Sequence, residues 1–292
     1  MAARPVDMKG RHVMITGATA GIGEAAAFAL AKMGAELTIV CRNPSKGEAT
    51  LEEIRRRHPS VEASMLIGDL GIQDDIRRVA DEFLSSDKPL HVLFNNAGVV
   101  QLGRSTTADG LETTFAVNHL GTFLLTNLLL ERMRTSAPAR VVCTASDAHR
   151  FAGRGLDFDD LQSEKNYTTF GAYGRSKLCN ILFTSELGRR ERERGSGVSA
   201  YSYHPGFVGS DFAKNNGMLA KVVMTLGAPF ARSPAKGAET GVYLCTSPDV
   251  AEQSGRYYFN NKLYPPASTA RLPGVAEKLW EVSESLVLEG RG

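Results

Sequence analysis

A glycine-rich turn between an apolar strand and an amphipathic helix is the feature that most limits what this chain can fold into. The apolar run at 12–15 predicts a strand, and the periodicity of Glu24–Met33 predicts a helix. Between them, Gly17 permits a tight turn, Gly21 lets backbone N–H groups approach a pyrophosphate, and Gly23 lets helix and strand pack closely. Because a helix N-terminus attracts anions, the pattern predicts a dinucleotide-binding site rather than a plain structural turn.

Strands and helices continue to alternate down the chain. Expected strands lie at 36–40, 61–67, 91–94 and 140–144, and expected helices at 45–57, 72–84 and 111–133. This order predicts an α/β fold, with a doubly wound parallel sheet covered by helices on both faces. Asp69, Asn95 and Ser146 each follow an expected strand. We therefore expect them at the edge where such sheets bind ligands, together with the glycine turn.

The end of the second expected strand bears on the choice of nucleotide. NAD-binding folds of this kind usually place an acidic residue here to hold the ribose 2′-hydroxyl, whereas this chain has Arg42. A guanidinium can pair with a 2′-phosphate, which favours NADP(H) over NAD(H). Lys46 is a further candidate for the phosphate, and the alternative for both residues is an ordinary place at the surface.

Tyr173 and Lys177 are candidates for acid/base chemistry. They lie four residues apart in an expected helix with an apolar stripe at Leu178, Ile181 and Leu182, so they share one face. A lysine ammonium beside a phenol favours the phenolate, which lowers the tyrosine pKa from about 10 towards working pH. Such a tyrosine can protonate a developing alkoxide or deprotonate an alcohol.

The same spacing occurs a second time, at Tyr258 and Lys262. Here Gly255 and the pair Asn260-Asn261 predict a strand and a turn instead of a helix. Four residues of strand would separate the two side chains by roughly 13 Å, too far for one to tune the other. We therefore interpret Tyr258 as a packing residue.

The composition excludes several classes of function. The formal net charge is +2, with 42% hydrophobic and 23% charged residues, which describes an ordinary globular chain without a nucleic-acid-binding surface. The N-terminus lacks the apolar core of a signal peptide, and no run approaches the ~18 apolar residues of a membrane span, so we expect a cytoplasmic protein. The four scattered cysteines predict reduced core residues.

Two histidines near the expected site have structural or pocket-lining roles in our interpretation. A hydrolase triad built on Ser146 would need a Gly-x-Ser-x-Gly turn, and the local sequence is Thr-Ala-Ser-Asp-Ala. His149 and His204 do not form a metal-binding spacing with each other or with a carboxylate, so no metal is expected.

The motifs together resemble the short-chain dehydrogenase/reductase family, and within it the retinol dehydrogenase-like branch. The family is indicated by Thr16-Gly17-x-x-x-Gly21-x-Gly23, Asn95-Asn96-Ala97-Gly98, Asn118, Ser146, Tyr173-x-x-x-Lys177 and Pro205-Gly206. The branch is indicated by Val40-Cys41-Arg42 and by residues 156–162, 176–184 and 279–284. The resemblance implies one Rossmann-type domain over 11–292, with about seven parallel strands, after an N-terminal tail at 1–10.

The resemblance also implies roles for single residues. Tyr173 would be the acid/base, and Lys177 would lower its pKa and hydrogen-bond the nicotinamide ribose. Ser146 would hold and polarise the substrate carbonyl, and Asn118 would position a water molecule in a proton relay. The residues expected at the cofactor are Gly17, Thr19, Gly21, Ile22, Gly23, Arg42, Asp69, Leu70, Asn95, Ala97, Gly98, Tyr173, Lys177, Pro205, Val208 and Ser210.

Within this set, Asp69 and Leu70 would flank the adenine, Asn95 would lie beside the cofactor ribose and Val208 would contact the nicotinamide amide. The apolar segment at about 207–235 would be a substrate lid, although such a segment can also be core. Family members often pair through helices around 112–133 and 171–194, which implies a homodimer or homotetramer.

The sequence thus predicts an NADP(H)-dependent oxidoreductase that interconverts an apolar carbonyl compound, such as an aldehyde, ketone or retinoid, with its alcohol. One alternative is reduction of a C=C bond, as in protochlorophyllide reductase-like relatives. The other is a non-catalytic NADPH sensor, which would not need Ser146, Tyr173, Lys177 and Asn118 together.

Overall fold

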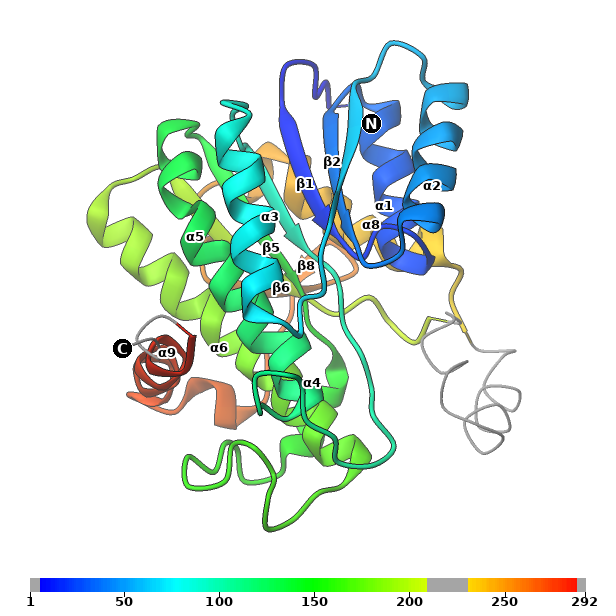
Figure 1. Cartoon of the computed structure of the whole chain (residues 1–292). Coiled ribbons are helices and arrows are strands. Elements are labelled where there is room, and N and C mark those ends of the chain that lie inside the picture. Colours follow the sequence, from blue (N-terminus) through cyan, green and yellow to red (C-terminus); the bar gives the residue numbers. More distant parts are fainter. Residues whose placement is uncertain (1–5, 209–230, 288–292) are drawn as a thin grey trace.

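A single sheet forms the centre of the molecule (Figure 1). The computed structural model describes residues 6–208 and 231–287, and in these residues the strand order is β3-β2-β1-β4-β5-β6-β7-β8. Neighbouring strands are parallel from β3 to β7, and β8 is antiparallel to β7. The strands are β1 (His12–Thr16), β2 (Glu36–Cys41), β3 (Ala63–Ile67), β4 (Val92–Asn95), β5 (Ala139–Thr144), β6 (Val198–Tyr203), β7 (Arg256–Phe259) and β8 (Lys262–Leu263).

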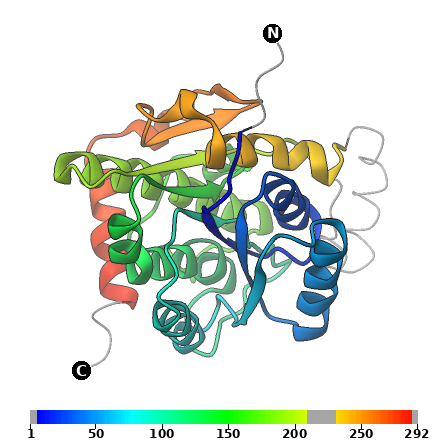
Figure 2. The same cartoon turned by 90° about the horizontal axis from the view of Figure 1, so that it is seen from above.

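Helices cover both faces of the sheet. On one side lie α1, α2 and α8, and on the other α3, α5 and α6, with α9 packed outside α5 and α6 (Figures 1 and 2). The helices are α1 (Gly21–Lys32), α2 (Pro44–Arg57), α3 (Gln73–Ser85), α4 (Thr113–Phe115), α5 (Gly121–Thr135), α6 (Thr169–Arg194), α8 (Pro234–Thr246) and α9 (Val275–Val287). A π-helical turn, η1 (Ala116–Leu120), joins α4 to α5.

Each face of the sheet has its own apolar core. Val13 and Ile15 belong to the core beneath α1 and α8, whereas Met14 belongs to the core beneath α3, α5 and α6. This alternation follows from the two-residue period of a strand. Because both faces are covered, all five residues of β1 are buried, and its three central residues are apolar without alternation.

Helix α6 is held at both ends by local sequence signals. The Thr168 hydroxyl accepts a hydrogen bond from the Gly171 amide at 3.2 Å and caps the N-terminus. Gly195, with φ of 66°, ends the helix in the left-handed conformation that glycine adopts without penalty. Between them, α6 packs on the sheet and also beneath α9, where the Trp280 ring stacks on Phe183 at 5.8 Å between centroids.

The predicted α/β class and doubly wound parallel sheet are confirmed. The residue pattern assigns neither β6 nor α8, and it does not anticipate that β8 extends the sheet beyond seven strands. Strand β8 forms because Asn260 and Asn261 adopt positive φ values of 51° and 59°, which asparagine tolerates in a tight hairpin turn. The helix expected over 111–133 is interrupted by the π-helical turn.

Across residues 6–208 and 231–287, none of the helices is both long enough and apolar enough to cross a membrane.

Candidate active site

The residues expected at the site come from the carboxyl ends of β1 to β6 and the segments that follow them, from the π-helical turn and from the first turns of α6. The parallel strands bring these ends to one edge of the sheet, in the lower part of the view in Figure 1. The glycine turn follows β1, Asn96–Gly98 follow β4, and Ser146 follows β5. The edge predicted from the order of strands is therefore the place where the structure gathers them.

The glycine turn has little room for any larger residue. Gly17 and Gly21 have φ of 67° and 60°, values that side chains other than glycine rarely adopt. A methyl group at Gly23 would lie 2.3 Å from the Gly17 carbonyl oxygen and 2.4 Å from the Asn96 amide nitrogen. The turn therefore fits tightly between α1 and the residues after β4. This agrees with the tight turn expected at Gly17 and the close packing expected at Gly23.

The N-terminus of α1 opens at this turn. Its N-cap is Ala20, whose methyl side chain cannot accept a hydrogen bond from the first amides of the helix. Those amides and the helix dipole suit an anion. Ile22 and Val208 both lie against Gly237 of α8, where an added methyl group would be 3.2 Å and 2.6 Å from them. The structure thus brings Val208 to the glycine turn, and Thr19 lies within the turn itself.

Asn96 is a residue whose role the sequence analysis missed. Its amide group donates hydrogen bonds to the carbonyl oxygens of Thr16 and Gly17, each at 3.2 Å. In return, the Thr16 hydroxyl accepts from the amides of Asn96 and Ala97 at 3.0 and 3.1 Å. Asn96 therefore joins the glycine turn to the end of β4. The paired asparagines directly after a strand were the available signal.

The Asn95 side chain, unlike that of Asn96, points away from the glycine turn and towards α5. Its side chain is buried and donates to the Thr126 hydroxyl on α5 at 3.0 Å. The side-chain oxygen of Asn95 has no hydrogen-bond partner among the residues that the structure describes. Leu70 is likewise buried, in the core on the α5 side of the sheet. Any contact of either residue with a cofactor stays a prediction.

Arg42 and Asp69 meet beyond the ends of β2 and β3. The Arg42 guanidinium is 3.5 Å from a carboxylate oxygen of Asp69, and 62% of the Arg42 side chain is exposed. The other Asp69 oxygen accepts from the Gly71 amide at 2.9 Å, which fixes the carboxylate. Arg42 is therefore accessible at the place where the sequence analysis puts a 2′-phosphate.

Tyr173 and Lys177 lie on one face of α6, with the Lys177 ammonium 5.6 Å from the centre of the Tyr173 ring. Lys177 donates to the Thr144 carbonyl at 2.9 Å, a contact between residues 33 positions apart. Burial lowers the pKa of Lys177 to about 8. Burial also raises the pKa of Tyr173 to about 12, and the hydrogen bond with Ser146 acts in the opposite direction. The lowering of the Tyr173 pKa by Lys177 therefore stays a prediction.

Asn118 is held by a network of hydrogen bonds that reaches α6. It lies on the π-helical turn, a distortion that is frequent at functional sites. Its side chain exchanges two hydrogen bonds with the Val99 backbone and donates a third to the Ser176 hydroxyl at 2.9 Å. Ser176 in turn donates to the Tyr173 carbonyl at 2.8 Å. Ser176, which the sequence analysis did not single out, thus links Asn118 to the Tyr173 backbone.

Gly98 lies where the side chains of Asn118 and Lys177 approach each other. A methyl group there would lie 3.2 Å from the Asn118 side-chain oxygen and 3.3 Å from the Lys177 ammonium nitrogen. Pro205 follows β6 at the same edge of the sheet, and Gly206 after it has φ of 86°. Ser210 and the lid residues from 209 to 230, including Phe212, Met218 and Leu219, lie outside the described residues.

The two histidines contact backbone atoms at the edge of the site. His149 is buried between Ser146 and Ala267, and His204 accepts from the Gly206 amide at 3.2 Å and stacks on Phe259. Burial lowers the pKa of both rings, that of His204 to about 4. Across the described residues, the His, Cys, Asp and Glu side chains form no cluster of three or more suited to a metal.

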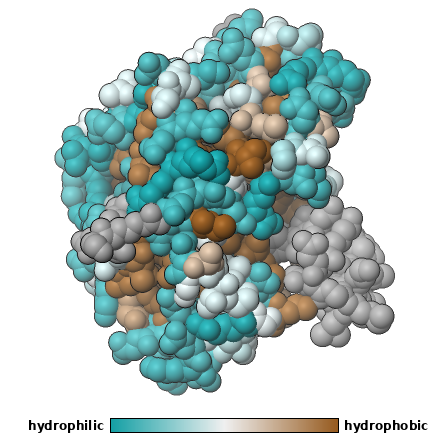
Figure 3. Space-filling model, viewed as in Figure 1, coloured by the Kyte–Doolittle hydropathy of each residue, from teal (hydrophilic) through white to brown (hydrophobic). Residues whose placement is uncertain are grey.

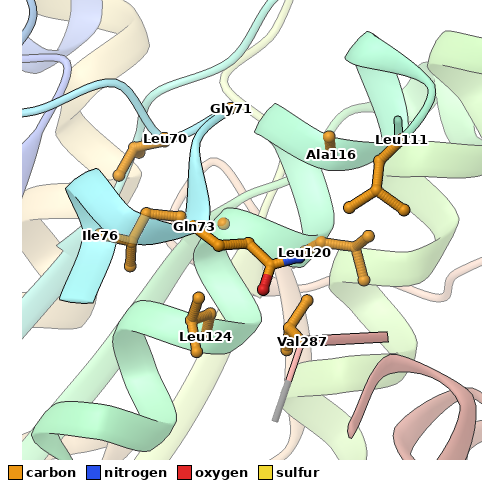
Figure 4. A pocket seen from close by; sticks show the side chains of 10 residues that line it. Leu70, Gly71, Gln73, Ile76, Leu111, Ala116, Leu120, Leu124 and Val287 are labelled. Atoms are coloured by element: carbon orange, nitrogen blue, oxygen red, sulfur yellow. The ribbon is translucent and has the colours of Figure 1, made fainter. Parts of the chain in front are cut away.

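A small apolar pocket lies between α3, the π-helical turn, α5 and the end of α9 (Figure 4). Tyr173, Lys177 and Ser146 do not line it. Its volume of about 10 Å³ is close to the least that holds a single water molecule. The apolar side chains that line it belong to the core, and together with the polar Gln73 they converge from several elements, as Figure 4 shows. The pocket is too small for a nucleotide or a substrate.

Comparison of this sequence with known proteins identifies the family to which it belongs. A model of short chain dehydrogenases matches residues 11–158. The chain belongs to the short-chain dehydrogenase family. Retinol dehydrogenase 12 of Mus musculus is 44% identical over 282 residues, which cover 97% of this chain and 88% of the relative. The WW domain-containing oxidoreductase of Gallus gallus is 38% identical, over 98% of this chain and 70% of that protein.

Solved structures agree with this membership. An uncharacterized protein of Mycobacterium paratuberculosis superposes with a TM-score of 0.74 at 31% identity, covering 97% of this chain and 95% of that one. The resemblance to retinol dehydrogenases deduced from the motifs is therefore confirmed at the level of family and branch.

Proposed function

We propose that the protein is an NADP(H)-dependent oxidoreductase that interconverts an apolar carbonyl compound and its alcohol. The observation that carries the proposal is the convergence of Tyr173, Lys177, Asn118 and Ser146 beside the glycine turn. A bound nicotinamide would supply or accept the hydride. The tight glycine turn and the uncapped α1 N-terminus fit the pyrophosphate of such a cofactor.

In the reducing direction, Tyr173 gives its phenolic proton to the carbonyl oxygen as charge develops there. Ser146 hydrogen-bonds the same oxygen, a contribution on the order of 3–4 kcal/mol for single donors in other enzymes. Lys177 stabilises the phenolate that remains on Tyr173. Asn118, held by Val99 and Ser176, positions a water molecule that returns a proton.

The preference for NADP(H) rests on Arg42. Its exposed guanidinium lies beyond the end of β2, 3.5 Å from Asp69, its one ion-pair partner within residues 6–208 and 231–287. The guanidinium is therefore available to a 2′-phosphate. Substituting Arg42→Ala should raise the Kd for NADPH about tenfold and leave the Kd for NADH within twofold, by the loss of one charge-assisted pair. Fluorescence titration of both nucleotides measures this, with the exposed Arg55→Ala variant as control; equal changes for both nucleotides would refute the preference.

An apolar substrate is supported by exposed apolar side chains near Tyr173. Phe151 and Phe170 are each 62% exposed, and their rings lie 6.0 Å apart. Phe170 precedes Tyr173 by three residues on α6, and Phe151 lies against Gly174. Figure 3 shows brown, apolar atoms in separate patches over both the upper and the lower half of the face in view. Exposed aromatic groups beside a reacting centre suit a hydrocarbon chain or ring.

Substrate screening tests the reaction itself. Aldehydes, ketones and retinoids are incubated with NADPH or NADH, and absorbance at the nicotinamide band is followed. We expect NADPH oxidation with apolar carbonyl compounds. NADPH binding without oxidation by any carbonyl compound would refute the proposal and favour the sensor, while turnover confined to conjugated C=C bonds would favour the reductase alternative.

A further inference from the structure

His149 is a buried histidine to which the proposed reaction assigns no step. It lies on the short 3-10 helix η2 (Asp147–Ala152) that follows Ser146, and its side chain has no exposed surface. Its ring packs edge-on against Tyr257 of β7, with 5.4 Å between centroids. The position is thus one helical turn from the serine that the proposed function places at the substrate oxygen.

Both ring nitrogens of His149 have backbone partners. Nδ1 lies 2.7 Å from the Ser146 carbonyl oxygen, and because a carbonyl only accepts, Nδ1 carries the proton. Nε2 accepts from the Ala267 amide at 2.9 Å. The contacts therefore specify one neutral tautomer, and burial lowers the pKa of His149 in agreement with a neutral ring.

The sequence explains why Ala267 is the donor. It follows Pro265 and Pro266, which have no amide hydrogen, so Ala267 offers the first free amide of this segment. The Pro265 carbonyl is bound by Arg150 at 3.1 Å, from the same helix η2. Two neighbouring side chains of η2 therefore fasten this helix to the segment after β8.

We propose that His149 is a positioning residue for Ser146: by clamping the Ser146 carbonyl to the Ala267 amide, it fixes the backbone from which the serine hydroxyl reaches the substrate oxygen. Ser146 has an extended backbone, with φ of −164° and ψ of 154°, and its hydroxyl accepts from the Ala148 amide at 3.1 Å. The Ser146 carbonyl also accepts from the His149 amide at 3.1 Å within η2. Loss of the imidazole therefore leaves that bond in place and removes only the tie between this peptide and the segment after β8. The inference rests on the proposed function, which gives Ser146 its role.

Two substitutions break the clamp from opposite ends. His149→Phe keeps a ring against Tyr257 and removes both nitrogens. Ala267→Pro removes only the amide hydrogen, and the φ of −54° at Ala267 suits proline. We expect each variant to reduce kcat for carbonyl reduction about tenfold, less than the loss of a direct oxyanion donor, with the Kd for NADPH unchanged. The double variant should be no slower than the slower single variant.

The matched control is Arg150→Gln, which removes the second tie to the same segment without touching Ser146 and should leave kcat within twofold. In a Ser146→Ala background, His149→Phe should cause no further loss, because the group it positions is gone. Equal losses with and without Ser146, or an unchanged kcat in folded Ala267→Pro, would overturn the inference. Circular dichroism establishes folding, and if His149→Phe does not fold, Ala267→Pro decides.

Nitrogen-15 NMR of the His149 ring tests the clamp independently of turnover. We expect the neutral tautomer protonated at Nδ1 at neutral pH; the Nε2-protonated tautomer or a charged ring would contradict the clamp. A wild-type protein without turnover on any substrate would refute the proposed function, and in that case the tautomer alone decides whether the clamp exists. Turnover with insensitive clamp variants would refute only the role of His149.

Discussion

The two pairs of tyrosine and lysine four residues apart have the same spacing and opposite environments. Tyr173 and Lys177 lie on one face of a helix, with the ammonium 5.6 Å from the phenol ring. Tyr258 is buried in β7 against the Tyr201 ring, whereas Lys262 lies across the hairpin on exposed β8, paired with Phe259. The four-residue spacing brings tyrosine and lysine onto one face only where the backbone is helical, as it is at Tyr173 and Lys177.

The structure confirms that Tyr258 is a packing residue. The separation of roughly 13 Å along one strand was wrong, because the hairpin turn brings Lys262 back on β8, opposite Phe259. Burial raises the pKa of both phenols to about 12, so a raised pKa does not distinguish the two tyrosines. What distinguishes them is contact: Tyr173 hydrogen-bonds Ser146, whereas Tyr258 packs within the α1–α8 core.

The largest expected effect is the loss of kcat when the Tyr173 hydroxyl is removed, compared with removal of the Tyr258 hydroxyl. Tyr173→Phe should lower kcat about 10³-fold, since positioned acid/base groups contribute about 10²–10⁴-fold. Tyr258→Phe should leave kcat within twofold. Steady-state kinetics on the best carbonyl substrate measures both, and equal losses from the two substitutions would abolish the distinction.

The lysines should differ in activity and in stability. Lys177→Met should lower kcat about 10²-fold by removing the charge beside the phenolate, and Lys262→Met should have no effect on kcat. The pKa of Lys177 is lowered in the folded state, so the unfolded state binds more protons between about pH 8 and 10.5. The buried charge therefore costs stability at neutral pH.

Lys177→Met should consequently raise the free energy of unfolding at pH 7, on the order of 1–3 kcal/mol after the lost bond to Thr144 is subtracted. The gain should shrink as pH rises from 8 to 10.5, because wild-type Lys177 is then already neutral. Urea denaturation at several pH values measures it. A variant less stable than wild type at pH 7 would show that the buried charge of Lys177 does not lower the free energy of unfolding.

A smaller effect is expected from pH. As pH rises through about 8, Lys177 loses its proton while Tyr173, with a pKa of about 12, keeps its own. The value of kcat/KM for carbonyl reduction, which reports the free enzyme, should fall about tenfold per pH unit above 8. The Lys262→Met variant should show the same fall and Lys177→Met should lack it; a flat wild-type profile up to pH 10 would contradict the assignment.

Much of the architecture was predictable because it is encoded locally. Apolar periodicity located β1, β2 and α1, and the tight turn expected at Gly17 has a φ of 67° there. Strand β8 was missed because two residues carry too short a pattern, and the π-helical turn was missed because its residues continue a helical periodicity.

The sequence by itself determined the order of the motifs, the helix that carries Tyr173 and Lys177, and the family to which the chain belongs. Tertiary structure decided the partners: Ser176 for Asn118, Thr144 for Lys177 and Ala267 for His149, which are 58, 33 and 118 residues apart in the chain. Periodicity reports only neighbours within one element. Contacts of this kind exist only once the sheet has brought the ends of its strands together.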